Sequence, residues 1–391
     1  MVLKKENMLC WLIIFAACST PEQTGEKTIW YKGNTHAHTT LCGHADTAPD
    51  TVAAWYLDRG YNFLILSEHN IFINPDSVLL PEPRRSDFIL IPGQEVTGHK
   101  HIHTTAMNTD HLVLDKTMKT IPEGLSAAEQ LQEKIRSLRV PIEETRTEIM
   151  QRHTSDIREA GGVPILNHPN FVTGAQANEI LEVDHLHMIE LYNGHPHVFN
   201  WGNDEHVSVE EKWDSLLSAG KLVLGISSDD AHHFKEYDAE QSNPGRGWVM
   251  VDSDGNLETD AITDAMARGQ FYSTSGVMLA EISHTPSEYE IEIDEAATAE
   301  ELASPYVIGK ISDAGTEGFQ TTFIGKDGVV LQQTDEGQTS FAITDEKSYV
   351  RAKVSYTRKL EDGKYETFFA WTQPRFLDGR AEMLESGGIY R

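Results

Sequence analysis

The sequence predicts an α/β protein in which βα units surround a parallel sheet or barrel, with a small β-sandwich after them. Two observations predict this class. From about residue 29 to about residue 272, short apolar runs alternate with stretches of helical periodicity, the pattern of repeated βα units. Beyond Gly276 strand patterns alternate with turn signals, and no convincing helix is present. We therefore expect a barrel-like domain over residues 29–275 and a β-sandwich domain over residues 276–391.

Seven apolar runs of the first domain are candidate strands. Each is short, rich in aliphatic and β-branched residues, and bounded by polar or turn-forming residues. In chain order they cover residues 28–38, 63–69, 88–96, 101–108, 163–169, 188–193 and 222–232. We expect these seven strands to form the sheet or barrel.

Helical stretches lie between several of these strands. In the first stretch, Val52, Trp55 and Tyr56 recur at helical spacing, and Gly60 suits a C-terminal cap. Further helices are expected over residues 126–138, 146–161 and 209–220. The segment from residue 110 to residue 162 is long for one crossover, so we expect two helices there, interrupted by Pro141.

The predicted β-sandwich shows the alternation of half-buried strands. Alternate side chains of residues 349–356 are apolar, and turn signals occur at residues 326–328 and 361–363. Of the 18 histidines only His284 lies in this part of the chain. Any chemistry that uses imidazole therefore belongs to the first domain.

The N-terminus has the form of a bacterial lipoprotein signal peptide. Its first eighteen residues have a basic start and an apolar run too short to span a bilayer. Small residues before Cys18 resemble a lipobox, although Phe15 stands where Leu is commoner, and an ordinary cleaved signal is the alternative. We expect a signal peptide over residues 1–18, lipid on Cys18 and a tether over residues 19–28. The protein would then be extracytoplasmic and anchored to a bacterial membrane.

Charge and cysteine count exclude two further features. The chain has 61 Asp and Glu against 32 Lys and Arg, a formal net charge of -29, and no basic stripe that could follow a phosphate backbone. Nucleic acid is therefore excluded as a partner. Of the three cysteines, Cys10 would leave with the signal and Cys18 would carry lipid, so only Cys42 remains and no disulfide can form within the chain.

The spacing of histidines indicates a metal site. His36 and His38 are two residues apart on a candidate strand, so their imidazoles point to the same side. Other metal-ligand residue types fall at the C-terminal ends of later strands, where barrel folds place their active sites. These residues are His69, Glu95, His168, Asp230 and His232. So many polar groups at one rim would be costly to desolvate without a cation, so we expect a metal centre there.

The fourth candidate strand leaves its ligand open. His99, His101 and His103 are spaced by two, so all three would share one face, and only one or two are needed. We favour His103, with His101 next.

The ordered series of motifs resembles the PHP (polymerase and histidinol phosphatase) family of metal-dependent phosphoesterases. The motifs are HAH, CGH, EH, GQE, HIH, NHP and DAH, and they cover residues 33 to about 272. CGHAD resembles the histidinol-phosphatase branch. GQEVT, GRGWVMV, GQFYSTSG and the β tail ending in AWTQP look more like the branch that includes carbaryl hydrolase. The resemblance implies a distorted seven-stranded βα barrel that holds two or three metal ions.

The resemblance also implies which residues hold the ions. One ion would take His36, His38, Glu95 and Asp230, a second would share Glu95 as a bridge and add His103 and His168, and a third would take His44, His69 and His232. Catalytic roles are expected for Glu95, Asp230, His38 and His168. The departure is Glu68, where the family usually has Asp. This departure leaves the predicted ligand His69 in place, so it bears on the geometry of the groups around the ligands more than on metal binding.

The donor set itself indicates the kind of metal and chemistry. Seven imidazoles with two carboxylates favour Zn, Mn or Fe over Mg or Ca. A bridging carboxylate such as Glu95 can hold two ions roughly 3.5–4 Å apart, where a shared water becomes hydroxide and attacks phosphorus. Beside the site, Cys42 is expected to be a small buried residue rather than a nucleophile. Asn193 and Arg246 are candidates for binding a substrate anion.

These predictions favour a metal-dependent hydrolase of phosphate esters, acting on a phosphomonoester or a small phosphodiester through a metal-bridging hydroxide. One alternative is a carbamate or amide hydrolase at the same metals, because hydroxide attacks an acyl carbon as readily. The other alternative is a metal- or glycan-binding lipoprotein without catalysis.

Overall fold

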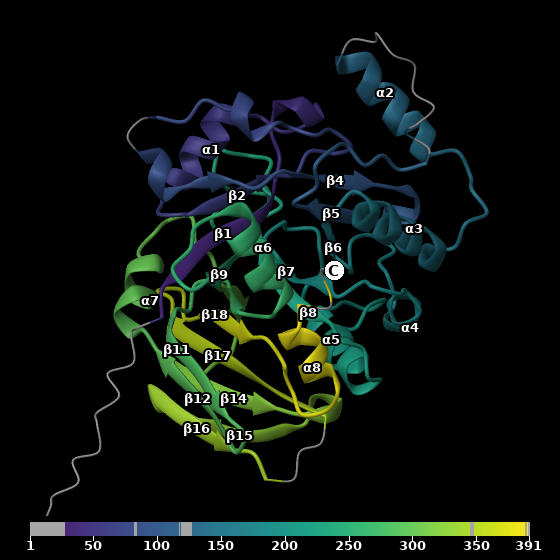
Figure 1. Ribbon diagram of the computed structural model, residues 1–391. Coiled ribbons are helices and arrows are strands. Elements are labelled where there is room, and N and C mark those ends of the chain that lie inside the picture. The colour runs from purple at the N-terminus through teal and green to yellow at the C-terminus, as the bar shows by residue number, and fades with distance from the viewer. Residues whose placement is uncertain are drawn as a thin grey trace, which may run out of the picture.

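Figure 1 shows the computed structural model of the chain, which describes residues 28–81, 84–116, 118, 127–344, 348–387 and 389. The predicted signal peptide, its lipidation site Cys18 and the tether except Thr28 lie outside the described residues. Among the described helices, none is long and apolar enough to cross a membrane.

The strands of the first part of the chain form two sheets. In one, β1 (Trp30–Ala37), β2 (Phe63–Leu66) and β3 (Ile89–Leu90) are parallel, and β9 (Trp248–Asp252) and β10 (Phe271–Thr274) extend it in antiparallel fashion beyond β1. The other has the order β4 (Gly93–Thr97), β5 (His103–Met107), β6 (Val163–Leu166), β7 (Met188–Asn193) and β8 (Leu224–Ser228). Its first two pairs are antiparallel and its last two are parallel.

The predicted barrel does not close as one continuous sheet. In the described part of the chain, ladder pairing between the two sheets is limited to single bridges, one between Ala37 and Ala231 and one between His69 and Glu95. All seven predicted strands are present, but the third divides at Pro92 into β3 and β4, which belong to different sheets. Pro92 has no N–H to donate to a ladder, so pairing is interrupted there. The α/β class is confirmed, in an open and mixed arrangement.

The predicted helices of this part are present. They are α1 (Pro49–Leu57), α2 (Ala127–Leu138), α3 (Arg146–Glu159) and α5 (Val209–Ser218), while α4 (Ala177–Leu181) and α6 (Thr259–Ala267) were not predicted. Capping boxes start α3 at Thr145 and α5 at Ser208, which explains their sharp beginnings. Helix α2 projects from the body in Figure 1, and its Lys134 Nζ reaches back to the backbone oxygen of His69 at 3.0 Å.

Strands of the C-terminal part belong to two layers. One is the three-stranded sheet of β11 (Leu279–Thr285), β12 (Glu288–Ile293) and β16 (Gln338–Ala342). The other strands are β13 (Lys310–Ser312), β14 (Gly318–Ile324), β15 (Val330–Thr334), β17 (Tyr349–Lys359), β18 (Tyr365–Thr372) and β19 (Arg375–Phe376). They join the sheet of β1 and β2 through the pairing of β18 with β10.

The two C-terminal layers pack face to face, but they do not form a separate sandwich. Tyr289 and Ile291 of β12 are buried in one cluster with Phe323, Val354 and Phe368 of the larger sheet. Because that sheet continues into β1, strands from both sides of residue 275 share it, and the domain boundary there stays a prediction. The short helices α7 (Glu295–Glu301) and α8 (Arg380–Glu385) lie where no helix was predicted.

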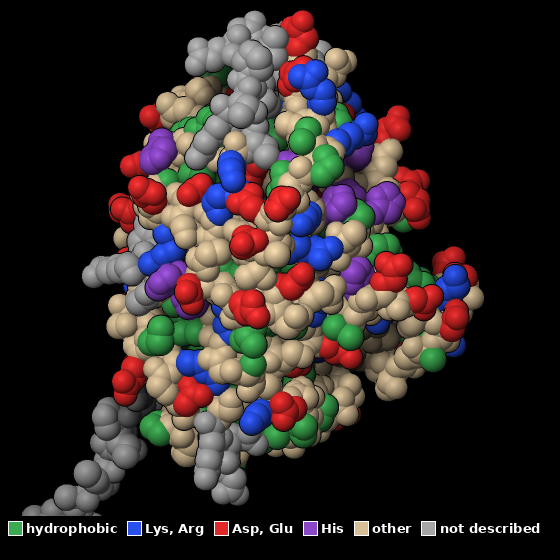
Figure 2. Space-filling view, turned by 90° about the vertical axis from the view of Figure 1, so that its right-hand side faces the viewer, with side chains coloured by type: hydrophobic (Ala, Val, Ile, Leu, Met, Phe, Trp, Pro, Cys, Tyr) green, Lys and Arg blue, Asp and Glu red, His purple; other side chains and the backbone are tan. Residues whose placement is uncertain are grey.

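The surface carries the excess of acidic groups. On the face shown in Figure 2, Asp and Glu side chains are spread widely, and Lys and Arg lie singly or in small groups among them. The exclusion of a nucleic-acid partner stays a prediction from charge.

Candidate metal centre

The nine predicted ligands come from separate strands and gather at the edge where the two sheets meet. His36 lies near the end of β1 and His38 directly follows that strand, His44 lies in the next loop, His69 and His168 follow β2 and β6, Glu95 lies in β4, and Asp230 and His232 follow β8. His103 differs from the other predicted ligands, because it begins its strand, β5. Since β5 runs antiparallel to β4, with His103 opposite Thr97, its N-terminal end lies at the same edge.

The Glu95 carboxylate lies at the middle of this cluster and is fully buried. Its Oε1 is 3.2 Å from His103 Nδ1 and 3.4 Å from both His168 Nε2 and His36 Nε2. Its Oε2 is 2.5 Å from His69 Nδ1 and 3.9 Å from His38 Nε2. The two oxygens therefore face different imidazoles, as a bridging carboxylate would.

Asp230 closes the cluster on the side of β1. Its Oδ1 is 3.3 Å from Nε2 of both His36 and His38, and those two nitrogens are only 3.1 Å apart. Beyond His38, the ring of His232 stacks at 4.1 Å between centroids, and the ring of His44 lies 4.6 Å from that of His232. The imidazoles thus form one continuous group.

Several groups of these side chains are spaced to hold a cation. In each group the ligand atoms lie within 4.8 Å of one another. The groups are His36, His38 and Asp230; Glu95, His103 and His168; His44, His69 and His232; His38, His69 and Glu95; and His38, Cys42 and His232. The first three together contain all nine predicted ligands.

Unpaired buried nitrogens support coordination over simple packing. His38 Nδ1, His168 Nδ1 and His232 Nε2 are buried with no hydrogen-bond partner among the described residues. An unpaired polar atom in the interior costs free energy, and several in one place need a compensating ligand. Divalent cations accept such nitrogen and carboxylate donors, so the residues present fit a metal centre.

Burial sets the charge state of the rings. It lowers the pKa of His38 to about 3 and those of His44 and His103 to about 4, with neighbouring imidazoles adding to the effect for His38 and His44. These rings are neutral near pH 7, which is the form that coordinates a metal. Burial raises the pKa of Glu95, but its interactions with the imidazoles of His103, His69 and His36 outweigh this effect and hold the pKa well below its usual range.

Glu190 is a residue of the candidate site that sequence analysis missed. It lies in the middle of β7, and its Oε1 is 2.7 Å from His36 Nδ1 while its Oε2 accepts the His168 amide at 2.7 Å. Ser228 Oγ donates to the same carboxylate at 2.5 Å. A carboxylate behind a ligand histidine fixes the ring and its tautomer. The signal was a glutamate inside the apolar strand MIELYN, where no charge belongs without a partner.

Asn193 and Asn167 also hold the ligands in place. Asn193 Nδ2 donates to Glu190 Oε2 at 2.8 Å and to Asp230 Oδ2 at 3.3 Å. Asn167 Nδ2 donates to Glu95 Oε1 at 2.8 Å. These contacts assign Asn193 an orienting role, and its predicted role in anion binding stays a prediction.

Arg246 is buried, and its guanidinium group forms hydrogen bonds within its own loop. Its terminal nitrogens donate to the backbone oxygens of Gln241 and Asp238 and to Asn243 Oδ1. A solvated loop charge was the alternative, and the structure rules that out because Arg246 is only 3% exposed. Binding of a substrate anion by Arg246, which stays a prediction, would compete with these bonds.

Of the three histidines before and in β5, only His103 reaches the cluster. His99 and His101 lie in a 3-10 turn in which Lys100 and His101 have positive φ, so the two-residue periodicity breaks there. His99 Nε2 pairs with the Val140 backbone oxygen, and His101 is exposed. The preference for His103 agrees with the geometry.

Two ligand residues have left-handed backbone conformations. His168 has φ 26° and Asp230 has φ 51°, values that cost L residues free energy. Such conformations persist only where the surroundings determine them, and they concentrate at functional sites. Here the Glu190 carboxylate binds the His168 amide and the His36 backbone oxygen accepts the Asp230 amide at 2.9 Å.

Comparisons with known proteins give little beyond this geometry. No protein-family model and no curated protein matches the chain. One solved structure with some likeness is named a "putative metal-dependent phosphoesterase" and comes from Bifidobacterium adolescentis; it is 13% identical, covers 56% of this chain and 91% of its own, and has a TM-score of 0.35. At that level the likeness carries no argument. The fold and the cluster by themselves define an α/β protein with a buried group of histidines and carboxylates able to bind metal ions.

Proposed function

We propose that this protein is a metal-dependent hydrolase of phosphate esters of the PHP type. The observation that carries the proposal is the position of Glu95, whose two oxygens face His103 and His168 on one side and His69 and His38 on the other. A carboxylate so placed is suited to hold two cations next to each other. The order of the motifs along the chain supports the same family.

The residues would divide among two or three ions. One ion would take His36, His38, Glu95 and Asp230, a second would share Glu95 as the bridge and add His103 and His168, and a third would take His44, His69 and His232. The nitrogen-rich donor set suits Zn, Mn or Fe. When bound, such ions lower the pKa of a coordinated water and neutralise charge on a phosphoryl group.

The chain's own residues supply the geometry. Glu190 orients His36 and the backbone of His168, and Asn193 links Glu190 to Asp230. Asn167 fixes Glu95 from the side of β6. Because the low pKa values keep His38 and His103 neutral, both remain available as ligands well below pH 7. The result is a preorganised site, which is the main requirement for phosphoryl transfer.

The test is turnover by the purified chain loaded with Zn, Mn or Fe. Aryl phosphates, alkyl phosphodiesters and aryl carbamates should be compared, and we expect phosphate release to be fastest. Replacing the central carboxylate in Glu95→Gln should lower turnover by at least ~100-fold, since electrostatic groups of this kind contribute that much. The exposed Glu236→Gln serves as the control.

Each other outcome identifies another function. If carbamates were hydrolysed faster than phosphate esters, the protein would be assigned as an acyl hydrolase that uses the same metal centre. Equal rates for Glu95→Gln and the wild-type chain would show that the cluster does not catalyse, in favour of a binding protein.

A further inference from the structure

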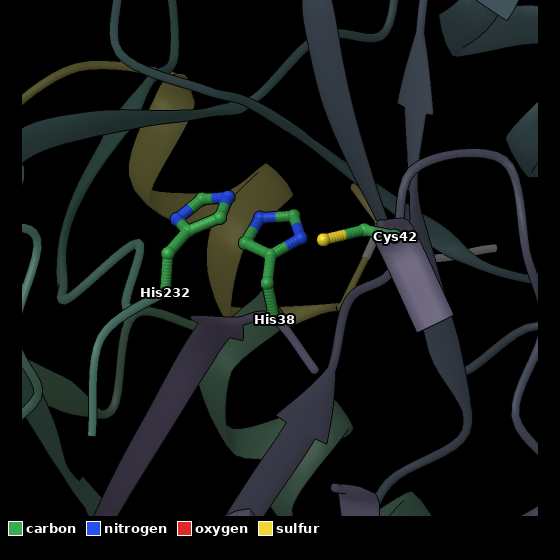
Figure 3. Close-up of side chains that lie close together, drawn as sticks. All are labelled: His38, Cys42 and His232. Carbon is green, nitrogen blue, oxygen red and sulfur yellow. The ribbon is translucent and has the colours of Figure 1, made fainter. Parts of the chain in front are cut away.

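Asp46 closes the motif CGHAD, in which only His44 is a predicted ligand. The motif begins in the 3-10 turn that follows β1. Its first residue, Cys42, is buried beside His38 and His232, and Figure 3 shows the sulfur pointing toward the His38 ring. Asp46 is half-buried and lies in none of the groups of described side chains that are spaced to hold a cation. Any contribution of Asp46 to the metal centre is therefore indirect.

Asp46 joins the loop that carries His44 to the loop that carries His232. Its backbone N–H donates to the His232 backbone oxygen at 3.0 Å. Its carboxylate accepts two backbone amides of the same loop, from Phe234 to Oδ1 at 3.0 Å and from Lys235 to Oδ2 at 3.3 Å. These bonds fix the two loops relative to each other.

The predicted third ion site depends on this link more than the other two sites do. Its ligands are His44, His69 and His232, and the His44 ring lies 4.6 Å from that of His232 and 5.0 Å from that of His69, between centroids. His44 is exposed and lies in a loop, whereas every predicted ligand of the other two sites is buried or half-buried. An exposed loop residue has more conformational freedom to lose when it binds an ion. A contact that holds its loop in place lowers that cost.

We propose that Asp46 is a positioning residue that fixes His44 and His232 for the third ion, and that the two ions at Glu95 do not depend on it. Both oxygens of Asp46 already accept backbone amides, so it acts through the loops and is not a ligand. Hydrogen bonds around the ligands govern metal affinity because they set the ligand geometry. The inference rests on the ion positions of the proposed function, but it concerns how many ions the chain holds and not which bond it cleaves.

Metal counting on the full chain tests this inference without any substrate. At a free zinc concentration just sufficient to fill the wild-type chain, equilibrium dialysis and elemental analysis should find three ions in the wild-type chain and two in Asp46→Asn. The substitution keeps the shape of the side chain but replaces one acceptor oxygen by an amide NH₂, which cannot accept a backbone N–H. Zinc affinity at the third site should fall by about 10-fold or more, while the other two affinities stay unchanged. The exposed Asp254→Asn is the matched control and should keep three ions.

A second variant identifies which ion is lost. His44→Ala removes a ligand of the third ion directly and should lose the same single ion. The double variant His44→Ala/Asp46→Asn should lose no further ion, because both changes act on one site. Circular dichroism of each variant checks that it folds.

The outcomes separate this inference from the proposed function. Three ions retained by Asp46→Asn at the same free zinc concentration would overturn the positioning role. Loss of all ions together would overturn it as well, because Asp46 would then support the fold as a whole, and so would a wild-type chain that never holds more than two ions. A chain that holds its ions in the expected pattern but hydrolyses no phosphate ester would contradict the proposed function alone.

Discussion

At the scale of single residues, the Glu190 carboxylate is the group that holds the predicted ligands from the side away from the metal centre. Glu190 is 1% exposed, and its carboxylate has four polar contacts. They come from the His36 ring, the His168 backbone amide, Ser228 Oγ and Asn193 Nδ2. A buried charge with this many partners is stable and holds its neighbours rigidly. The metal affinity should therefore depend on Glu190 although it is not a ligand.

Glu190→Gln is expected to weaken zinc binding by about 10–100-fold, the usual effect of losing a partner behind a ligand histidine. Competition with a chelating dye measures this affinity. Glu182→Gln, at an exposed position, should bind zinc like the wild-type chain. Equal affinities for both variants would assign Glu190 a role in folding only.

The depressed pKa values predict how the metal-free protein responds to acid. His38 and His103 have folded-state pKa values of about 3 and about 4, below the ordinary imidazole pKa of about 6.5, so the unfolded chain binds more protons than the folded chain between these pH limits. The contribution of these two rings to stability is therefore full above about pH 6.5 and declines as the pH falls toward 4, by about 1.4 kcal/mol for each pKa unit of a buried ring. The raised pKa of His36 acts only above about pH 6.5 and does not oppose this decline.

Urea unfolding in the presence of a chelator, at several pH values, measures the effect. A His103→Asn variant should lose stability less steeply over the same range, because one depressed group is gone. A decline as steep as that of the wild-type chain would contradict the role of this ring.

At the scale of elements, β8, the strand that precedes Asp230, is held by the C-terminal part of the chain. The Gln373 side chain bonds both the N–H and the C=O of Gly225 in β8, at 2.9 and 2.8 Å, and Ser273 Oγ donates to the same oxygen at 2.7 Å. These bonds satisfy backbone groups of β8 that its hydrogen-bond ladder with β7 leaves free. The C-terminal strands thus position one side of the metal centre.

Gln373→Ala should lower the free energy of unfolding by about 1–3 kcal/mol, because it leaves a buried backbone amide unpaired. Denaturant unfolding of the chelated protein measures the change. The matched control is the exposed Gln333→Ala, which should change the stability little. Similar losses in both variants would show that Gly225 finds other partners.

At the scale of the whole molecule, the two halves of the chain form one structure. The pairing of β10 with β18 joins their strands into one sheet. Arg351 of β17, 1% exposed, bonds Asp214 of α5 at 2.7 Å and Glu210 at 2.9 Å. Removing either half would leave a buried charge unpaired and a strand edge open.

A chain that ends at Ser275 is therefore not expected to fold or to bind metal. Limited proteolysis of the intact protein tests this without a truncated chain, and no stable fragment should end near residue 275. A soluble fragment of residues 28–275 that binds zinc would contradict the coupling and confirm two separate domains.

The sequence by itself determined the α/β class, the seven strand segments and the side chains that can bind metal, because these follow from local periodicity and residue chemistry. It did not determine that Pro92 splits a strand between two sheets, that the 3-10 turn at residues 99–101 removes His99 and His101 from the cluster, or that Glu190 supports His36. Only the tertiary structure decided these points, together with the place of Cys42 beside His38 and His232. Each depends on contacts between segments far apart in the chain, and a local pattern such as the glutamate within MIELYN does not tell which partner the residue meets.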